Sequence, residues 1–144
     1  MTGSNDTPQP PTVVAIDIAK HYHEILIEPP PPKRRSRLRV ANRREEFEHL
    51  AGYLRGLRSS VLIGFEATGN YHRPLAYFLH RQGFELRLIP TLALARTREA
   101  MHNSWDKSDP KDAQVILHLL KTGLAQSWHD LIRERLVRLP NDLA

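Results

Sequence analysis

The sequence contains no cysteine, which excludes a disulfide framework, a thiolate zinc site and a cysteine nucleophile. It also has no apolar run close to the roughly 18 residues that span a bilayer, which excludes an integral membrane protein. Residues 1–11 are polar and contain prolines in place of an apolar segment, so we expect no secretory signal. These absences predict a cytoplasmic protein that has no membrane partner.

The composition is that of one globular domain. Of the 144 residues, 40% are hydrophobic and 26% are charged, which is enough apolar material for a single core. Lysine and arginine number 21 against 16 acidic residues, giving a formal net charge of +5.

The positive charge is concentrated in one block that no acidic residue interrupts. Its members are Lys33, Arg34, Arg35, Arg37, Arg39, Arg43 and Arg44. Such a block on a nearly neutral body predicts a polyanion partner, because phosphate contacts supply most sequence-independent affinity for nucleic acids. A solvated, mobile, arginine-rich loop is the alternative interpretation.

Hydrophobic patterning predicts an alternation of strands and helices. Strands are expected at Thr12–Ala19, Glu24–Glu28, Arg37–Ala41, Val61–Glu66 and Glu85–Pro90. Helices are expected at about Asn42–Leu57, Pro74–Gln82, Thr91–Ala100 and Pro110–Lys121, with a further helix at Leu131–Leu139. Three leading strands followed by alternating helices and strands predict an α/β fold, a mixed five-stranded sheet flanked by helices in RNase H-like order.

The expected domain covers residues 12–123. It is preceded by a disordered lead over residues 1–11 and followed by a helical extension over residues 124–144. Residues 29–36 form a Pro/Arg-rich insertion between the second and third strands, and its four prolines predict a stiff polyproline spacer.

Side chains that favour helix ends occur at two of the predicted helices. Asn42 is a suitable N-cap for the first. In the last, Asp109 is a suitable N-cap, with Pro110 at the first helical position and Asp112 in the first turn, where the helix dipole favours an acid. Gly123 ends this helix.

Two acids occupy positions that suggest a site. Asp17 interrupts the most apolar segment of the chain, and an ionised carboxylate there is costly unless it is paired, hydrogen-bonded or bound to a metal. Glu66 closes the fourth strand. In the RNase H-like order these strands are parallel neighbours, so both acids emerge at the carboxyl edge of the sheet, where such folds bind ligands. The alternatives are a core acid held by backbone N–H groups and an ordinary strand-end acid.

Asp109 and Asp112 continue the apolar stripe of the last helix one turn earlier, so they also face the sheet. Capping and a role in the site are compatible. Four carboxylates without cysteine suit Mg²⁺ or Mn²⁺ better than zinc. The histidines share no ligand spacing and are interpreted as surface residues or neighbours of ligands; those considered are His21, His23, His72, His80, His102 and His118.

Three sequence blocks then resemble one family in their order and spacing: residues 15–20 (AIDIAK), 65–71 (FEATGNY) and 107–113 (KSDPKDA). They are similar to the DEDD-type, RuvC-like transposases of insertion sequences, the insertion-sequence-110 family. The resemblance runs from about Val13 to Gly123.

The resemblance implies that Asp17, Glu66, Asp109 and Asp112 are the catalytic, metal-binding tetrad of an RNase H-like domain similar to Holliday-junction resolvases. It further implies that the family recombines DNA, both element ends and target, under the guidance of a structured RNA. We expect a homo-oligomer of the full-length protein.

Family members continue through a coiled coil into a second domain that carries a nucleophilic serine. This chain ends at Ala144, so we expect a truncated product or a fragment that does not complete recombination alone. Metal binding, nucleic-acid binding and weak nuclease activity are the capabilities expected of it. None of its serines is assigned the nucleophile's role.

Two other functions stay open at this point: an independent nuclease that acts on branched DNA like a resolvase, and a non-catalytic nucleic-acid-binding remnant with a structural tetrad. A sugar-kinase or actin-like ATPase also begins with a hairpin and an early aspartate. The chain is too short for the two lobes of such an enzyme, and it has no second phosphate loop.

Overall fold

The structure, a computed structural model, describes residues 9–67, 69–101, 109–123 and 125–127. Within them lies one six-stranded sheet with the strand order β3-β2-β1-β4-β5-β6. The strands are β1 (Thr12–Asp17), β2 (Tyr22–Glu28), β3 (Ser36–Ala41), β4 (Val61–Phe65), β5 (Glu85–Leu88) and β6 (Gln126–Ser127).

The strand directions are those of the RNase H-like fold, which confirms the prediction from the sequence. β1, β2 and β3 form an antiparallel meander, whereas β4 pairs parallel to β1 and β5 parallel to β4. All five predicted strands are present. The sixth, β6, is a two-residue strand antiparallel to β5, in a segment that the sequence analysis assigned to a helical extension. The predicted helix at Leu131–Leu139 lies outside the described residues.

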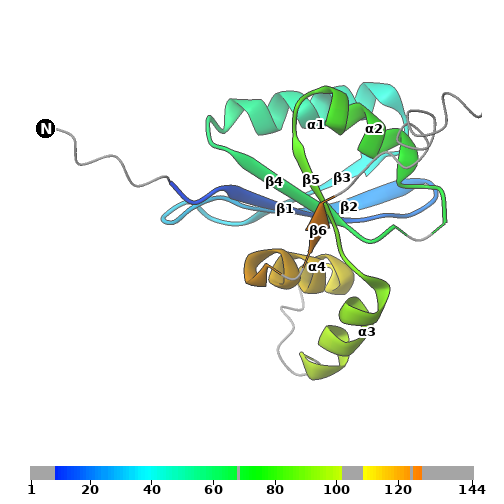
Figure 1. The fold of residues 1–144 in the computed structure, drawn as a ribbon. Coiled ribbons are helices and arrows are strands. Elements are labelled where there is room, and N and C mark those ends of the chain that lie inside the picture. Colours follow the sequence, from blue (N-terminus) through cyan, green and yellow to red (C-terminus); the bar gives the residue numbers. More distant parts are fainter. Residues whose placement is uncertain (1–8, 68, 102–108, 124, 128–144) are drawn as a thin grey trace, which may run out of the picture.

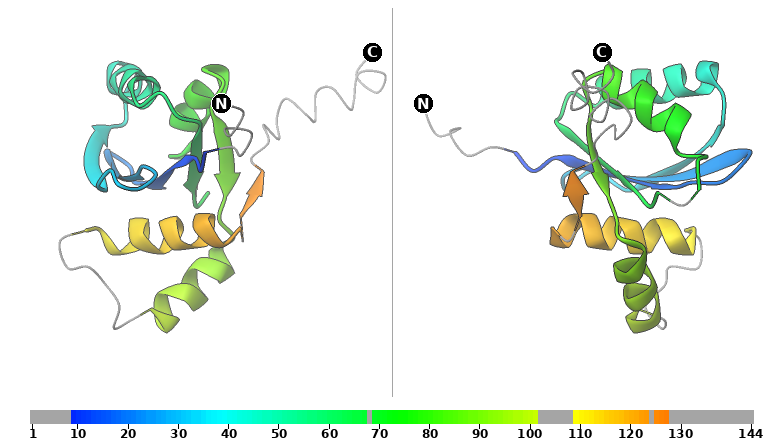
Figure 2. Two further views of the ribbon diagram at one scale, coloured as in Figure 1. Left: turned by 90° about the vertical axis from the view of Figure 1, so that its left-hand side faces the viewer. Right: turned by 45° about the vertical axis from the view of Figure 1, so that its right-hand side comes forward.

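Four helices in the described part of the chain cover both faces of the sheet. They are α1 (Arg44–Gly56), α2 (Arg73–Arg81), α3 (Thr91–Ala100) and α4 (Lys111–Thr122). α1 and α2 lie on one face, and α3 and α4 lie on the other (Figures 1 and 2). We call these the α1–α2 layer and the α3–α4 layer. No helix among the described residues has the length and apolar character needed to cross a membrane.

The alternation of side chains along the central strands gives each layer its own core. Val14 and Ile16 of β1 pack with the α1–α2 layer, whereas Val13 and Ala15 pack with the α3–α4 layer. β1 is therefore buried on both faces, which explains its continuous apolar run.

Gly64 of β4 allows α4 to lie directly against the sheet. A Cβ atom at this position would come within 2.4 Å of the Leu120 side chain of α4, a distance that requires something to shift. The absence of a side chain on β4 therefore sets how closely α4 approaches the strands.

The predicted helix caps are wrong by one residue in each case. Arg43, not Asn42, is the N-cap of α1, and the Asn42 side chain instead donates a hydrogen bond to the Lys20 carbonyl. Pro110, not Asp109, is the N-cap of α4. The Asn42 amide thus stabilises the β1–β2 connection and not the helix. Gly123, with φ at +80°, ends α4 as predicted.

The proline-rich insertion is a turn rather than the stiff polyproline spacer that the sequence predicts. The Lys33 N–H donates to the Pro30 carbonyl at 3.2 Å, closing the turn between β2 and β3. Polyproline II has no such internal hydrogen bond. The basic residues of the insertion therefore begin immediately beside the end of β2.

Candidate functional site

Asp17 is the last residue of β1, and the strand register places it opposite Glu24 of β2. Its position in the alternation is that of Val13 and Ala15, so its side chain lies on the face covered by the α3–α4 layer. Glu24 lies on the same face and accepts a hydrogen bond from Arg39 Nε at 2.7 Å. The hairpin therefore brings a second acid beside the one that the sequence predicted.

Glu66 follows β4 directly, at the same edge of the sheet as Asp17. β1 and β4 are parallel neighbours, with Ile16 opposite Phe65, which confirms the predicted pairing. Glu66 also continues the alternation of Leu62 and Gly64, both of which face α4. Two carboxylates thus lie at the carboxyl ends of adjacent parallel strands, Asp17 as the last residue of β1 and Glu66 directly after β4.

Asp112 lies in the first turn of α4, near enough to Asp17 for its charge to raise the pKa of that residue. The Arg98 side chain of α3 binds its Oδ1 atom, with Nη2 at 2.8 Å and Nε at 3.0 Å. Both nitrogens thus donate to a single carboxylate oxygen, a charge-assisted contact between α3 and α4. Arg98 joins α3 to α4 at the point where α4 meets the sheet.

These acids form one electrostatic unit, which we call the acidic site: Asp17, Glu24, Glu66 and Asp112. Burial, and after it the charges of Asp112, Glu24 and Glu66, together raise the pKa of Asp17 to about 6 against the lowering effect of Arg98. A carboxyl group with a raised pKa among other carboxylates marks a place that favours a cation.

Asp109 does not join this cluster. Its Oδ2 atom accepts a hydrogen bond from Arg35 Nη1 at 3.2 Å, and Arg35 also binds Glu28 at 2.9 Å. The Gln114 side chain holds the Asp109 carbonyl at 3.0 Å. The expectation that Asp109 and Asp112 face the sheet together therefore holds for Asp112, whereas Asp109 faces the β2–β3 turn.

The donor set of the acidic site fits a hard divalent cation, because it consists of carboxylate oxygens whose mutual repulsion a cation would relieve. In the described part of the chain, however, no three His, Asp or Glu side chains lie close enough together to hold a metal ion. Arginines bind both Asp109 and Asp112 instead.

Sequence reasoning missed Glu24 and Arg98 as parts of the site. Glu24 could have been found from the hairpin, since a short connection after Asp17 returns the second strand beside it, with alternate residues on the same face. Arg98 gives no such signal, because its contact with Asp112 depends on how α3 packs on α4.

The basic block is distributed over three parts of the structure. Lys33 and Arg34 are exposed in the turn, and Arg35 binds Glu28 and Asp109. Arg37 and Arg39 lie on the edge strand β3, and Arg43 and Arg44 lie at the start of α1. Nucleic-acid binding by these residues stays a prediction.

Of the two interpretations given to the histidines, surface residue or neighbour of ligands, the first does not apply to His23. His23 is fully buried beneath α1, where its ring stacks on Phe47 and its Nδ1 atom accepts the Ala19 N–H at 3.1 Å. Burial lowers the pKa of His23, so the neutral ring is favoured. Its role is to fix the β1–β2 connection beside Asp17.

The strand order, together with acids after β1 and β4, defines this chain as an RNase H-like protein with an acidic site at the carboxyl edge of its sheet. The model of the DEDD transposases of the insertion-sequence-110 type, described as "Transposase", matches residues 14–135. The chain belongs to this family and is a transposase domain.

Other comparisons add likeness of structure alone. The chain is similar to the Thermus thermophilus RuvC structure, with a TM-score of 0.48 and 11% identity, over 81% of this chain and 99% of that one. T. thermophilus RuvC in complex with a Holliday junction substrate gives a TM-score of 0.47 and 11% identity, over 83% and 100% of the two chains. A search of curated proteins found no match.

Proposed function

We propose that this chain is the metal-dependent catalytic domain of a transposase that moves an insertion sequence by cutting and rejoining DNA strands. Membership of the transposase family supports the reaction class. The observation that carries the proposal is the placement of Asp17 and Glu66 at the carboxyl ends of the parallel neighbours β1 and β4, with Asp112 near enough for its charge to raise the pKa of Asp17.

In this proposal Asp17, Glu66, Asp109 and Asp112 hold Mg²⁺ or Mn²⁺. Two such ions, when bound, activate a water or hydroxyl and stabilise the leaving oxygen of a phosphodiester. The central strands fix Asp17 and Glu66, since the parallel ladder between β1 and β4 sets their relative height. To hold the cations, Asp112 would have to release Arg98 and Asp109 would have to release Arg35.

The proposed partners are DNA, both element ends and target, and a structured guide RNA, with homo-oligomers in the full-length protein. Exposed members of the basic block support a polyanion partner: Lys33, Arg34 and Arg37 are exposed, and Arg43 and Arg44 keep more than two thirds of their side chains accessible. Absence of cysteine supports a cytoplasmic setting.

The test is metal binding by the chain, followed by recombination in the full-length transposase. Mn²⁺ should bind and broaden NMR signals at the ends of β1 and β4, and Asp17→Asn should remove this broadening. In the full-length protein the same variant should abolish DNA processing. Glu45→Gln, which changes an exposed carboxylate of α1, is the matched control. Unaltered Mn²⁺ binding or recombination in Asp17→Asn would reject the proposal.

One observation favours a second candidate, a non-catalytic nucleic-acid-binding domain. The arginines on Asp109 and Asp112 occupy the carboxylates that catalysis needs. If these ion pairs are permanent, chelators change neither the stability nor the nucleic-acid affinity of the domain, whereas replacing exposed arginines between Arg34 and Arg44 weakens binding. Cleavage of four-way DNA junctions by this chain alone would instead identify an independent resolvase-like nuclease.

A further inference from the structure

A groove lies between α1 and α2, on the opposite face of the sheet from the acidic site. Phe47 of α1 and Phe78 of α2 meet at its base, with ring centroids 6.0 Å apart. The cavity measures about 430 Å³, which is within the usual range for small-ligand pockets. We call it the α1–α2 groove. It can therefore hold a group of about the size of one nucleotide.

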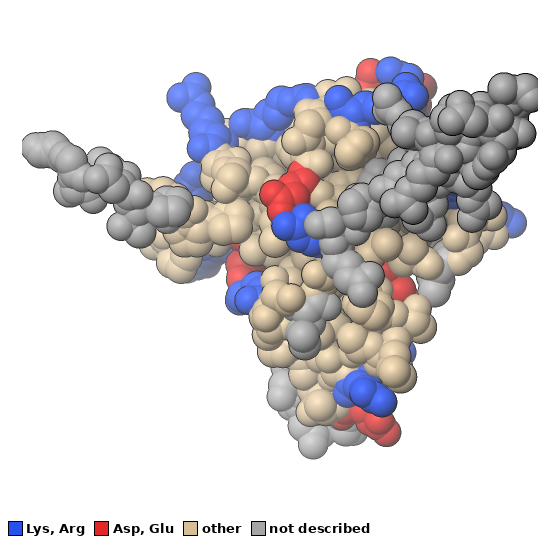
Figure 3. Space-filling view, in the orientation of Figure 1, with Lys and Arg blue, Asp and Glu red and all other residues tan. Residues whose placement is uncertain are grey.

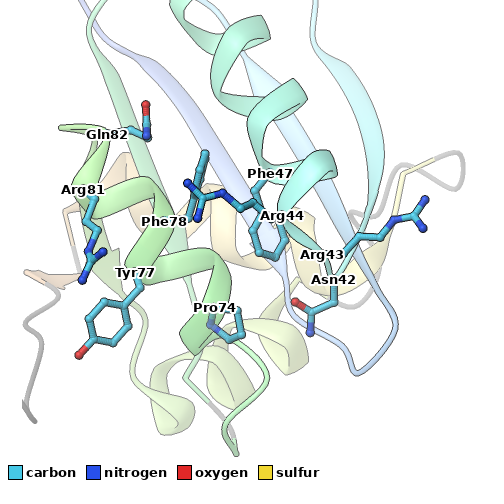
Figure 4. Close-up of a pocket in the computed structure, with 9 residues that line it drawn as sticks. All are labelled: Asn42, Arg43, Arg44, Phe47, Pro74, Tyr77, Phe78, Arg81 and Gln82. Atoms are coloured by element: carbon cyan, nitrogen blue, oxygen red, sulfur yellow. The ribbon is translucent and has the colours of Figure 1, made fainter.

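The walls of the groove carry positive charge without any acid. Arg43, Arg44 and Arg81 line it, and no aspartate or glutamate is among its nine lining residues. Figure 4 shows Arg44 reaching from α1 toward Phe78 of α2, Arg81 and Tyr77 side by side on α2, and Arg43 pointing away from α2. Lysine and arginine side chains gather over this layer in Figure 3.

Arg43 and Arg44 differ from Arg39 of the basic block in how closely acids approach them, since the Arg43–Glu45 contact is 4.0 Å long and both side chains are exposed. Arg39 forms an ion pair at 2.7 Å with Glu24. Arg44 is 3.9 Å from Glu48, and both side chains are more than half exposed. Contacts of this length between exposed charges are weak. The charge of the groove is therefore open to an anionic ligand.

Planar groups accompany the charge. The Arg44 guanidinium lies over the Phe78 ring, 5.8 Å from its centroid, and Tyr77 forms part of the opposite wall. Arginine with aromatic rings is the combination that binds unpaired nucleotides, since the rings stack with a base while the cations contact phosphate. Duplex DNA keeps its bases stacked inside and cannot use such a wall.

We propose that the α1–α2 groove binds an unpaired nucleotide of a single-stranded nucleic acid, separately from the acidic site. Arg44 and Arg81 contact the phosphates, and Tyr77 with the Arg44–Phe78 stack receives the base. This goes beyond the proposed catalytic function, because binding here needs neither a metal nor the carboxylates.

The experiment measures the affinity of the protein for labelled single-stranded RNA, single-stranded DNA and duplex DNA by fluorescence anisotropy, in buffer that contains EDTA. Arg44→Gln/Arg81→Gln should weaken single-strand binding at least tenfold and reduce the salt slope by about 1.4, roughly 0.7 for each lost phosphate contact. Arg58→Gln/Arg96→Gln removes the same charge outside the groove and should change affinity much less. Tighter binding of RNA or of DNA identifies the source of the strand, and either supports the proposal.

Stacking of the base in the groove can be measured separately from affinity. A 2-aminopurine base in the oligonucleotide should lose fluorescence on binding, and Tyr77→Leu should restore part of it while Tyr77→Phe does not. Circular dichroism and thermal melting check that each variant is folded. The proposal is overturned if the two double variants lose affinity equally or if 2-aminopurine is not quenched. It is also overturned if duplex DNA binds equally tightly in a groove-dependent way, or if poly-glutamate competes with the oligonucleotide as well as an unlabelled single strand does. Since EDTA removes metals, these outcomes do not depend on catalysis.

Discussion

At the residue scale, Asp17 shows how a single side chain can be both predictable and dependent on its surroundings. A charged residue within an apolar strand is conspicuous in the sequence, and the structure places it among three other acids. The size of its pKa shift was not predictable, because Glu24 and Asp112 reach it only through the hairpin register and the packing of α4.

Replacing Asp17 with asparagine should stabilise the domain at neutral pH. The pKa of Asp17 is about 6 in the folded state against an ordinary value of 3.8, so the ionised side chain disfavours folding, and does so in full above pH 6. The stabilisation should be full at pH 7–8 and should disappear as the pH falls through 6 toward 4, where the native carboxyl is protonated. Thermal melts of both proteins without metal, between pH 4 and 8, check this.

Glu45→Gln is the control for that series, since this carboxylate is exposed on α1. An Asp17→Asn gain that stayed constant from pH 4 to 8 would show that the variant acts by packing rather than by removing a charge. Added Mn²⁺ should make the native protein more stable than Asp17→Asn, because a bound ion stabilises only the ionised carboxylates.

At the element scale, the local sequence pattern was sufficient to predict that the strands and helices exist but not at which residues they begin and end. Apolar spacing located α1 because Phe47, Leu50 and Leu54 form its buried face. Asn42 and Asp109 were predicted as caps, yet contacts with Lys20 and Arg35 determine their positions. These partners are distant in sequence, so cap chemistry alone could not identify the first helical residue.

The close packing of α4 on the sheet should depend on Gly64. Gly64→Ala places a Cβ against Leu120, and we expect a loss of about 1–3 kcal/mol in the free energy of unfolding, as is usual for overpacking. Leu120→Ala alone should also destabilise, through a cavity. The double variant should recover part of the Gly64→Ala loss, since the shorter side chain makes room. Chemical denaturation of the four proteins gives the coupling energy.

Gly52→Ala is the matched control, because nothing lies within 4 Å of a Cβ there and Gly52 is exposed inside α1. It should leave stability unchanged or increase it by about 0.5–1 kcal/mol, the helix preference of alanine. If the changes in the free energy of unfolding caused by Gly64→Ala and Leu120→Ala were strictly additive in the double variant, the packing argument would be contradicted.

At the scale of the whole molecule, a chain of ion pairs joins both ends of α4 to the β2–β3 side of the sheet. Lys121 contacts Glu28 at 2.6 Å, Glu28 contacts Arg35 at 2.9 Å, and Arg35 contacts Asp109 at 3.2 Å. Its members are distributed over almost the full length of the domain. No local pattern could predict this chain, although each strand and helix that supports it was predicted.

Glu28 contacts Lys121 in the last turn of α4 directly and reaches Asp109 only through Arg35, so Glu28→Gln should loosen the C-terminal turn of α4. Burial alone would raise the pKa of Glu28, but hydrogen bonds from Lys121 and Arg35 lower it overall. Its contribution is therefore present above pH 4.5 and is lost as the pH falls through the lower folded value. We expect a loss of about 1 kcal/mol at neutral pH that shrinks in 1 M salt.

Amide hydrogen exchange over residues 117–121 measures this loosening, and it should be faster in Glu28→Gln. Glu48→Gln, which alters an exposed pair within α1, should leave exchange in α4 unchanged. Equal exchange in the native protein and in Glu28→Gln would show that apolar packing alone positions α4.

The outermost strand β3 has a consequence for how copies of this protein can meet. An unpaired strand edge invites another chain to add its own strand. Arg37 and Arg39 stand at alternate positions of β3 and are both exposed, so a neighbouring strand would have to be laid beside two hydrated cations. At the β3 edge the sheet is thereby discouraged from growing into a continuous ribbon, so we expect copies of the protein to meet through surfaces other than this strand.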